Sequence, residues 1–396
     1  MEKKDKIPQI RFAGFNEPWE QRKFSDIFNY ERPDNYIVKS VEYNDNFETP
    51  VLTANKGFIL GYTNEKNIYK NKSIIFDDFT LDSKYIDFPY MVKSSAIKIL
   101  TIKNSKKDNL KCAYYLLSSA NVESLGHARH YISIVQSTNV FTPTIAEQNK
   151  IASSIGTVDN LITLHQRKLE KLKTLKKSLL EKMFPKSGYT VPEIRFKNFT
   201  DPWEQRKLSE IVSMHARIGW QNLRTSEFLD SGKYMLITGT DFEDGVINYK
   251  TCHYVEQKRY DQDKKIQIKN GNILITKDGT LGKVAYVKEL TLPATLNAGV
   301  FNLELKNINF YDSKYLFQYL KAPFLMNYVE KNATGGTIKH LNQNILINFP
   351  VKLSDRKEQE QVGLVFERID NLITLHQRQF DKLNNIKKSL LEKMFV

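Results

Sequence analysis

The chain has 396 residues, 41% of them hydrophobic, which is enough for two or three domains with cores of their own. Its formal net charge of +14 and isoelectric point near 9.3 point to an anionic partner, most often nucleic acid, although a lysine-rich protein without such a partner explains the charge equally well. The two cysteines lack metal-ligand spacing, and neither a signal peptide nor an apolar run of membrane-spanning length is found. We therefore expect no disulfide framework or zinc site, and a soluble cytoplasmic protein.

An extended segment opens the chain and is written again in its middle. Residues 8–23 read PQIRFAGFNEPWEQRK and residues 192–207 read PEIRFKNFTDPWEQRK. Proline, Arg-Phe and Pro-Trp pairs without periodicity predict an extended strap that is neither helix nor strand. We expect Trp19 and Trp203 to hold each strap against an apolar surface. That surface is either the adjacent domain, which is the favoured interpretation, or a partner contacted directly.

A globular domain follows each strap. In the first, apolar and β-branched runs predict strands at Ser73–Phe76 and Ala96–Ile102, then a helix at Leu110–Ser119. The second shows the same progression from strands to helices. Its expected strands are Tyr234–Ile237, Lys265–Ile268, Asn272–Thr276, Lys283–Val287 and Val300–Leu305, and its expected helices are Ser313–Tyr319 and Phe324–Val329. Mixed strands followed by helix indicate an α+β fold class.

A long helix after each domain is the clearest repeat in the chain. The segments DNLITLHQR (Asp159–Arg167 and Asp370–Arg378) and KKSLLEKMF (Lys176–Phe184 and Lys387–Phe395) are identical in the two copies. Apolar residues recur in heptads, which predicts that the two helices pair as a coiled coil. The seam positions are Ile155, Val158, Ile162, Leu169, Leu172, Leu179 and Met183 in the first copy, and Phe366, Ile369, Ile373, Phe380, Leu383, Leu390 and Met394 in the second.

Polar residues interrupt both seams at equivalent places, His165 and Lys176 in one copy and His376 and Lys387 in the other. A capping box is expected at each start, from Thr144 to Glu147 and from Asp355 to Glu358. If the helices are antiparallel, the two histidines meet near a pseudo-two-fold axis and fix the register. An equally weighted alternative leaves both histidines pointing to solvent beside the seam.

The chain is therefore a cyclic arrangement of three parts used twice, with two globular α/β domains separated by a pair of long antiparallel helices. The expected parts are a strap (1–24), a domain (25–143), a helix (144–184), a strap (185–208), a domain (209–353) and a helix (354–396).

Residues for catalysis are missing from the sequence. No phosphate-binding GxxxxGK[ST] loop occurs, and Gly279–Lys283 has the wrong spacing and is interpreted as a hairpin turn. The Asn-Pro-Pro-aromatic tetrapeptide that amino-methyltransferases use is not found either. Asp77, Asp78 and the Asp82-Ser83-Lys84 triplet only faintly resemble a metal-dependent nuclease and are better explained as a charged loop. We infer a protein that binds and positions without catalysing a reaction alone.

Loops that combine cations with small residues are the expected nucleic-acid contacts, because arginine and lysine reach phosphates and guanine edges while glycine and threonine allow close backbone approach. Two stretches of the second domain fit this description. One stretch of the first domain occupies the place that corresponds to the later of these two, shortly before the long helix. The candidate DNA-binding residues are Lys277, Asp278, Gly279, Thr280 and Lys283; Thr334, Gly335, Gly336, Thr337, Lys339 and His340; and His127, Arg129, His130 and Tyr131.

These residues carry a resemblance to the specificity (S) subunit of type I restriction–modification enzymes over nearly the whole chain. The matching segments are the PWEQRK straps, ILITKDGTLGKVAYV (Ile273–Val287), ATGGTIKHLN (Ala333–Asn342), FPVKL before the second long helix, and the paired helices themselves. The first domain departs from the pattern, because Phe76–Thr80 reads FDDFT where the second domain has Lys277–Thr280. Its half of the target must therefore differ.

The resemblance implies a protein that is not an enzyme by itself. Each globular domain would be a target recognition domain reading one half of a bipartite double-stranded DNA sequence. The helices would dock two methyltransferase (M) subunits, which use S-adenosylmethionine to methylate adenine, and restriction (R) subunits would add cleavage that needs ATP and Mg. We expect partner-binding by Trp19, Arg22, Trp203 and Arg206 of the straps and by Lys168 and Lys171 of the first long helix.

Two other functions compete with this one. A stand-alone DNA-binding or coiled-coil scaffold protein would have the same straps and helices but no enzymatic partners. A self-sufficient nuclease would need a carboxylate cluster that the sequence does not provide. In the favoured function the helix pair sets the distance between two readers, so half-sites should lie on one face of DNA, about a helical turn (~34–36 Å) apart.

Overall fold

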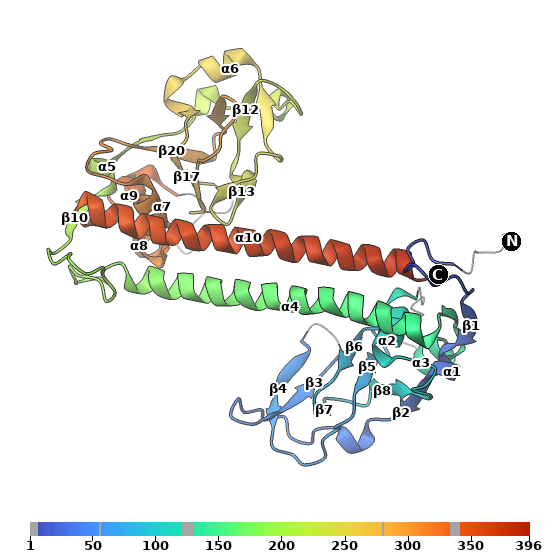
Figure 1. Ribbon diagram of the computed structural model, residues 1–396. Coiled ribbons are helices and arrows are strands. Elements are labelled where there is room, and N and C mark those ends of the chain that lie inside the picture. Colours follow the sequence, from blue (N-terminus) through green and yellow to red (C-terminus); the bar gives the residue numbers. More distant parts are fainter. Residues whose placement is uncertain (1–6, 55–56, 121–129, 279–280, 333–340) are drawn as a thin grey trace. The chain divides into compact units, whose positions relative to one another are not determined.

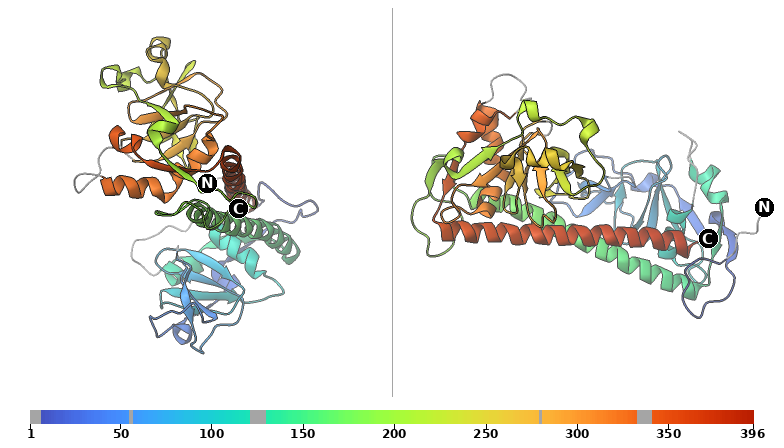
Figure 2. Two further views of the ribbon diagram at one scale, coloured as in Figure 1. Left: turned by 90° about the vertical axis from the view of Figure 1, so that its left-hand side faces the viewer. Right: turned by 90° about the horizontal axis from the view of Figure 1, so that it is seen from above.

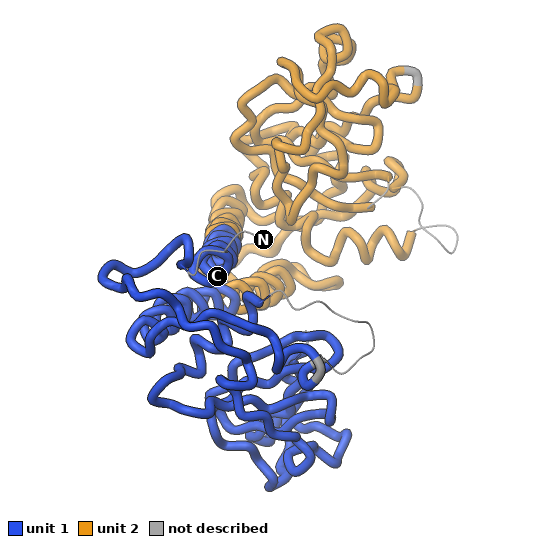
Figure 3. The backbone as a smooth tube through the Cα atoms, turned by 90° about the vertical axis from the view of Figure 1, so that its right-hand side faces the viewer, with its two compact units in different colours: residues 1–167, 377–396 blue, residues 168–376 orange. Residues whose placement is uncertain are grey.

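The computed structural model describes residues 7–54, 57–120, 130–278, 281–332 and 341–396 (Figure 1). The chain forms two compact units, which are coloured separately in Figure 3. Unit 1 comprises Met1–Arg167 with Gln377–Val396, and unit 2 comprises Lys168–His376. Each unit contains one strap, one globular domain and a portion of each long helix. None of the described helices is both long and apolar enough to cross a membrane.

The domain of unit 1 is built on a four-stranded antiparallel sheet and a smaller sheet. The larger sheet has the order β2 (Phe28–Glu31), β8 (Ile97–Ile102), β5 (Ser73–Asp77), β6 (Ser83–Ile86). The smaller has the order β4 (Ile59–Thr63), β3 (Thr49–Leu52), β7 (Met91–Val92), with β3 and β7 parallel. Strand β5 is buried on both faces, because Ile74 and Phe76 pack into one cluster of buried side chains and Ile75 into another.

Unit 2 repeats this design with longer connections. Its main sheet has the order β11 (Val212–His215), β20 (Val300–Leu305), β17 (Ile273–Thr276), β18 (Val284–Tyr286), the same order as in unit 1. A second sheet has the order β15 (His253–Val255), β12 (Tyr234–Ile237), β19 (Ala294–Leu296), β16 (Gln267–Ile268). Shorter elements are the hairpin β13 (Phe242–Glu243) with β14 (Val246–Ile247), and the helices α6 (Gln257–Asp261), α8 (Pro323–Asn332) and α9 (Gln343–Ile347). The expected α+β fold class is confirmed.

One domain helix in each unit packs against the following long helix. These are α2 (Leu110–Ser119) in unit 1 and α7 (Ser313–Lys321) in unit 2, both close to the expected bounds. Asn109 caps α2 by accepting a hydrogen bond from Cys112 N at 3.0 Å, and Asp312 caps α7 by accepting from Tyr315 N at 2.8 Å. Equivalent caps start equivalent helices, which is direct structural support for the internal repeat.

The straps end in short strands, which corrects the expectation that they contain none. In unit 1, β1 (Glu20–Lys23) pairs antiparallel with β9 (Asn139–Thr142). In unit 2, β10 (Glu204–Lys207) pairs in the same way with β21 (Pro350–Leu353). The short helices α1 (Phe24–Ile27) and α5 (Leu208–Ile211) follow directly. The polar sequence EQRK forms a strand here because its backbone N–H and C=O groups bond to the strand before each long helix.

The two long helices are α4 (Ile145–Lys182) and α10 (Arg356–Met394), each unbroken in the views of Figure 2. Within unit 2 their portions are antiparallel, because Lys176 pairs with Asp370 while the later Phe184 stacks on the earlier Phe366. Within unit 1, Asp159 pairs with Lys387, and the earlier part of α4 shares a core with the end of α10. His165 belongs to unit 1 and His376 to unit 2, and the predicted contact between them stays a prediction.

The predicted capping boxes are wrong in one respect. Asp355 does cap α10, because its Oδ1 accepts from Glu358 N at 3.1 Å. The carboxylates of Glu147 and Glu358 do not return to the cap but bind the straps. Arg11 donates to both oxygens of Glu147 at 2.9 Å, and Arg195 donates to those of Glu358 at 2.8 and 2.9 Å.

Candidate nucleic-acid interface

A hollow of about 440 Å³ in unit 2 is lined by Lys277 and Asp278 of the first predicted stretch of the second domain and by Leu341, the residue that follows the second stretch in sequence. Leu341 N donates to Lys277 O at 2.8 Å, so the residue that follows the ATGGTIKH stretch is bonded directly to the loop after β17. The hollow is lined by Ala216, Arg217, Ile218, Gly219, Lys277, Asp278, Phe301, Leu341 and Gln343. The structure thus brings together parts of the chain that are more than sixty residues apart in sequence.

The loop between β17 and β18 presents cations beside the hollow. Lys277 N donates to Gly299 O at 2.9 Å, and its ammonium lies 5.4 Å from the centre of the Phe301 ring. Asp278 and Lys283 are exposed. Strands β17 and β18 are antiparallel neighbours, so the expectation of a hairpin at this place is confirmed. An exposed lysine in the connection between two strands is suited to contact with a DNA phosphate.

Several candidate residues lie outside the described part of the chain, and their predicted contacts stay predictions. These are His127 and Arg129 of the first domain and Gly279, Thr280, Thr334, Gly335, Gly336, Thr337, Lys339 and His340 of the second. His130 begins the short helix α3 (His130–Ser133), and its side chain is likewise not described.

Tyr131 must be corrected as a DNA-contact candidate. Its side chain is fully buried, and its ring packs against Phe76 and Tyr30 at centroid distances of 5.6 and 5.3 Å. Burial raises the pKa of its phenol well above the ordinary value. Its backbone N donates to Asp78 Oδ1 at 2.8 Å, so this tyrosine is tied to the loop after β5.

Asp77 and Asp78 hold a turn in the first domain. Asp77 Oδ1 accepts from Phe79 N at 2.9 Å and from Thr80 N at 3.0 Å. Asp78 forms an ion pair with the buried Lys98 at 3.4 Å. Among the described residues, no group of three or more His, Cys, Asp or Glu side chains could hold a metal ion. The interpretation of this segment as a charged loop holds for Asp78 and Asp82, but it is wrong for Asp77, which ends β5, and for Ser83 and Lys84, which begin β6.

Sequence reasoning missed Arg217, which is only 1% exposed. Its guanidinium donates to Leu296 O at 2.9 Å, Thr295 Oγ1 at 3.2 Å, Gln221 O at 3.2 Å and Gln262 Oε1 at 3.4 Å. Burial, followed by the nearby charge of Arg259, lowers its pKa from the ordinary arginine value. The sequence feature that could have indicated a role for Arg217 is its position after a strand, two residues before the small residue Gly219.

The strap tryptophans are buried inside their own units, which corrects their assignment to partner-binding. Trp19 lies against Phe395 with ring centroids 6.2 Å apart, and Trp203 lies against Phe184 at 6.3 Å. Trp203 Nε1 also donates to Glu358 Oε2 at 3.1 Å. The structure therefore favours local packing over a direct partner contact for both indoles.

The charged candidates for partner-binding differ in exposure. Arg22 is held by Asp108 through two hydrogen bonds of 2.6 and 3.0 Å, which raise its pKa, and little of its side chain is exposed. Arg206 pairs with Glu204 at 2.8 Å and remains largely exposed. Lys168 and Lys171 are exposed on α4. Only the last three are available at the surface.

Exposed apolar residues accompany these lysines. Leu161, Leu164 and Leu175 of α4 are exposed, as are their repeat counterparts Leu372, Leu375 and Ile386 of α10. Leu161 and Leu164 lie three positions apart in unit 1, and Leu372 and Leu375 do so in unit 2. Three positions are nearly one turn of 3.6 residues, so each leucine pair forms a short stripe on its helix. An identical apolar stripe on two helices is a surface that a repeated partner could cover.

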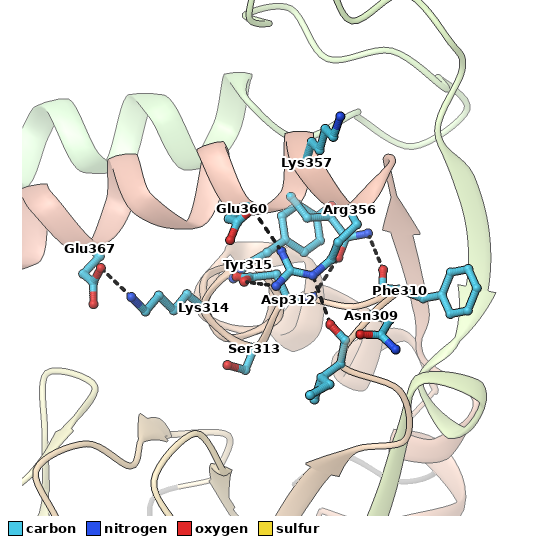
Figure 4. A network of polar contacts seen from close by, with 12 residues as sticks. Asn309, Phe310, Asp312, Ser313, Lys314, Tyr315, Arg356, Lys357, Glu360 and Glu367 are labelled. Atoms are coloured by element: carbon cyan, nitrogen blue, oxygen red, sulfur yellow. Dashed lines mark hydrogen bonds and ion pairs between the residues drawn. The ribbon is translucent and has the colours of Figure 1, made fainter.

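Polar contacts tie the second domain to its long helix in unit 2 (Figure 4). Arg356, in the first turn of α10, reaches Asp312 at 3.3 Å and donates to Ile308 O at 3.2 Å. Lys314, two residues after Asp312, pairs at 2.7 Å with Glu367, eleven residues after Arg356 in α10. Gln359 donates to Phe310 O at 3.1 Å and accepts from Asp312 N at 3.0 Å. The globular domain of unit 2 is thus fixed to the helix.

Two domains of one design, each fixed to a long helix, and a cation-lined hollow on one of them are typical of a DNA-binding protein with two readers. The family model for the type I restriction modification DNA specificity domain matches residues 16–174 and again residues 200–385. The chain belongs to this family.

Similar proteins extend over nearly the whole chain. The EcoR124I/EcoR124II specificity subunit of a type I restriction enzyme from Escherichia coli is 27% identical over 381 residues, covering 90% of each protein. The MjaVIII specificity subunit from Methanocaldococcus jannaschii is 21% identical over 411 residues, covering 98% of this chain and 95% of the relative. The crystal structure of a type I S subunit from M. genitalium has the same fold, with a TM-score of 0.67, 17% identity and coverage of 98% and 99%.

Family membership settles the general role. The chain is a specificity subunit, which selects DNA sequence in a type I restriction–modification system and is not the catalytic chain of that system.

Proposed function

We propose that this chain reads a bipartite double-stranded DNA sequence, with one half-site bound by the domain of each unit. The observation that carries the proposal is the bond from Leu341 N to Lys277 O, which joins two cation-bearing stretches at one hollow in unit 2. Lys277, Asp278 and Lys283 contact DNA there, together with the sequence neighbours Gly279, Thr280 and Thr334–His340. His127, Arg129 and His130 serve the first domain.

The long helices α4 and α10 act as the spacer between the two readers and as the docking surface for partners. Support comes from the repeated stripe of exposed apolar residues, because the same surface presented twice suits two copies of one partner. These partners are two methyltransferase subunits, which bind S-adenosylmethionine and methylate adenine. Lys168 and Lys171 of α4 and Arg206 of the second strap contribute to these contacts. Restriction subunits join the complex and use ATP and Mg for cleavage.

Shortening both helices by one heptad tests the spacer. Deleting 169–175 from α4 and the equivalent 380–386 from α10 removes about 10 Å of rise from each while keeping the register of their pairing. We expect the two half-site sequences to stay the same and the gap between them to shrink by roughly three base pairs, at ~3.4 Å each. Mapping methylated adenines in cells that express the shortened chain measures this. An unchanged gap would disprove the spacer.

Purification from the native cell tests the partners. We expect the full chain to carry two large subunits that confer adenine methylation on DNA. If the chain binds its target alone and no methyltransferase accompanies it, the stand-alone scaffold is the better description.

A further inference from the structure

Arg217 occupies an unusual position in unit 2. It stands just after β11, and its guanidinium is buried with four oxygen acceptors around it. Among the described residues, no carboxylate lies within ion-pair distance of it. A buried charge held only by neutral oxygens is costly, and such a group persists where its geometry is needed.

The contacts of Arg217 join two sheets. The arginine itself follows β11 of the main sheet, while Leu296 and Thr295 belong to β19 of the second sheet. Its bond to Gln221 O fixes the segment between β11 and residue 221 from the other side. That segment includes Ile218, which is 50% exposed and lines the hollow, as does Lys277.

The domain of unit 1 has no counterpart to this arrangement. At the end of β2, which holds the place of β11, the chain has Arg32 and then Pro33. Arg32 forms an exposed ion pair with Asp34 at 3.2 Å, with 64% of its side chain exposed. The buried arginine is therefore a feature of one reader and not of the repeated scaffold.

We propose that Arg217 is a positioning residue that fixes one wall of the hollow, the segment 216–221, and so sets how strictly the second domain discriminates its DNA half-site. This inference rests on the proposed function, in which the hollow contacts DNA. Arg217 acts indirectly in this proposal, because four of its five N–H donors are already used inside the protein. It acts through Ile218 and Gly219, which line the hollow together with Lys277.

The test uses the full chain with its methyltransferase partner and duplexes carrying single-base changes in one half-site at a time. For Arg217→Met, we expect discrimination at the second half-site to fall roughly tenfold, within the cost of a mismatched base pair, and discrimination at the first to stay within twofold of wild type. Arg217→Lys should not restore it, because an ammonium lacks the planar fork that reaches several acceptors at once.

Two further variants separate positioning from loss of folding. Thr295→Val keeps the arginine and nearly the same volume but removes one acceptor, and should lower second-site discrimination by about two- to fivefold. Arg32→Met in the first domain should leave second-site discrimination unchanged. Thermal unfolding of each variant shows whether unit 2 stays folded.

Three results would overturn the proposal. These are unchanged second-site discrimination in a folded Arg217→Met protein, equal losses at both half-sites, and a fall of about one in the slope of affinity against salt, which marks a direct phosphate contact. A wild-type complex whose second half-site does not depend on residues 209–353 would instead refute the proposed function, whatever Arg217 does.

Discussion

Lys176 Nζ lies 2.6 Å from Asp370 Oδ1, and the repeat counterparts of these residues, Lys387 and Asp159, lie 2.7 Å apart. Each aspartate also binds the domain helix beside it, since Tyr115 OH donates to Asp159 Oδ2 at 2.6 Å and Gln318 Nε2 donates to Asp370 Oδ2 at 2.8 Å. Each lysine that interrupts the apolar seam thus forms an ion pair with an aspartate of the other long helix. The same aspartate secures the domain.

Removing Lys176, and with it the ion pair to Asp370, should destabilise unit 2. The Lys176 and Asp370 side chains are 11% and 29% exposed, so solvent screens their attraction only in part. We expect Lys176→Met to lower the free energy of unfolding by roughly 1–3 kcal/mol, as for hydrogen bonds between charged groups. Lys177→Met, at the exposed neighbouring position, is the control and should change it little. Chemical denaturation followed by circular dichroism measures both, and equal losses would contradict the prediction.

Two helical glycines should respond in opposite ways to alanine. A Cβ at Gly363 would lie 2.9 Å from Asp312 Oδ1 and 3.0 Å from the backbone N of Tyr315, where α7 crosses α10. At Gly156 the nearest atom is the mobile end of Lys111, at 2.8 Å. Gly156→Ala should therefore stabilise by about 0.5–1 kcal/mol through helix propensity, while Gly363→Ala should destabilise. Unfolding midpoints compare the two, and a gain at Gly363 would show that α7 can shift.

Lys321 should make the stability of unit 2 depend on alkaline pH. Burial, reinforced by the charge of Lys176, lowers the pKa of Lys321 from 10.5 to about 8, and its ammonium donates to Asp244 O. Between these values the unfolded chain binds more protons than the folded one, so this group makes stability rise with pH from about 8 towards 10.5.

Comparing Lys321→Met with wild type isolates this effect. The difference in unfolding free energy, wild type minus variant, should increase between pH 8 and 10. Lys331→Met, at an exposed position of α8, should show no such trend. A difference that is flat or falls with pH would mean that the ammonium of Lys321 is not penalised in the folded state.

Lys283 should contribute to DNA affinity without contributing to sequence choice. It is exposed and directly precedes β18, at the end of the β17–β18 connection whose Lys277 and Asp278 line the hollow. For Lys283→Ala, affinity should fall for cognate and unrelated duplexes alike, and the slope of log affinity against log salt should fall by about 0.9. Binding titrations at several salt concentrations measure this. A loss confined to cognate DNA would identify a base contact instead.

Elements with strong apolar patterns were predictable from sequence, and polar ones were not. The helix Leu110–Ser119 and the strand Tyr234–Ile237 match their expected bounds because apolar runs between breakers specify them locally. Strand β10 is exposed along its length and depends on its pairing with β21, which only the tertiary fold provides. The same limit applies to the site. Tyr131 resembled a binding residue but its ring belongs to the core, and Arg217 gained its role from β19.

The strap contacts place the beginning of the described chain beside its end. Ile10 N donates to Lys393 O at 2.9 Å in unit 1, and Ile194 N donates to Lys182 O at the same distance in unit 2. In unit 2 the eleven residues 183–193 connect the bonded segments covalently, and in unit 1 the same bond forms without such a connection. A gene opened between α4 and the second strap, with its original ends fused, would therefore encode every one of these contacts. A half of different specificity exchanged at these junctions would have to keep the ion pairs of Lys176 with Asp370 and of Asp159 with Lys387, which join the two halves of the sequence.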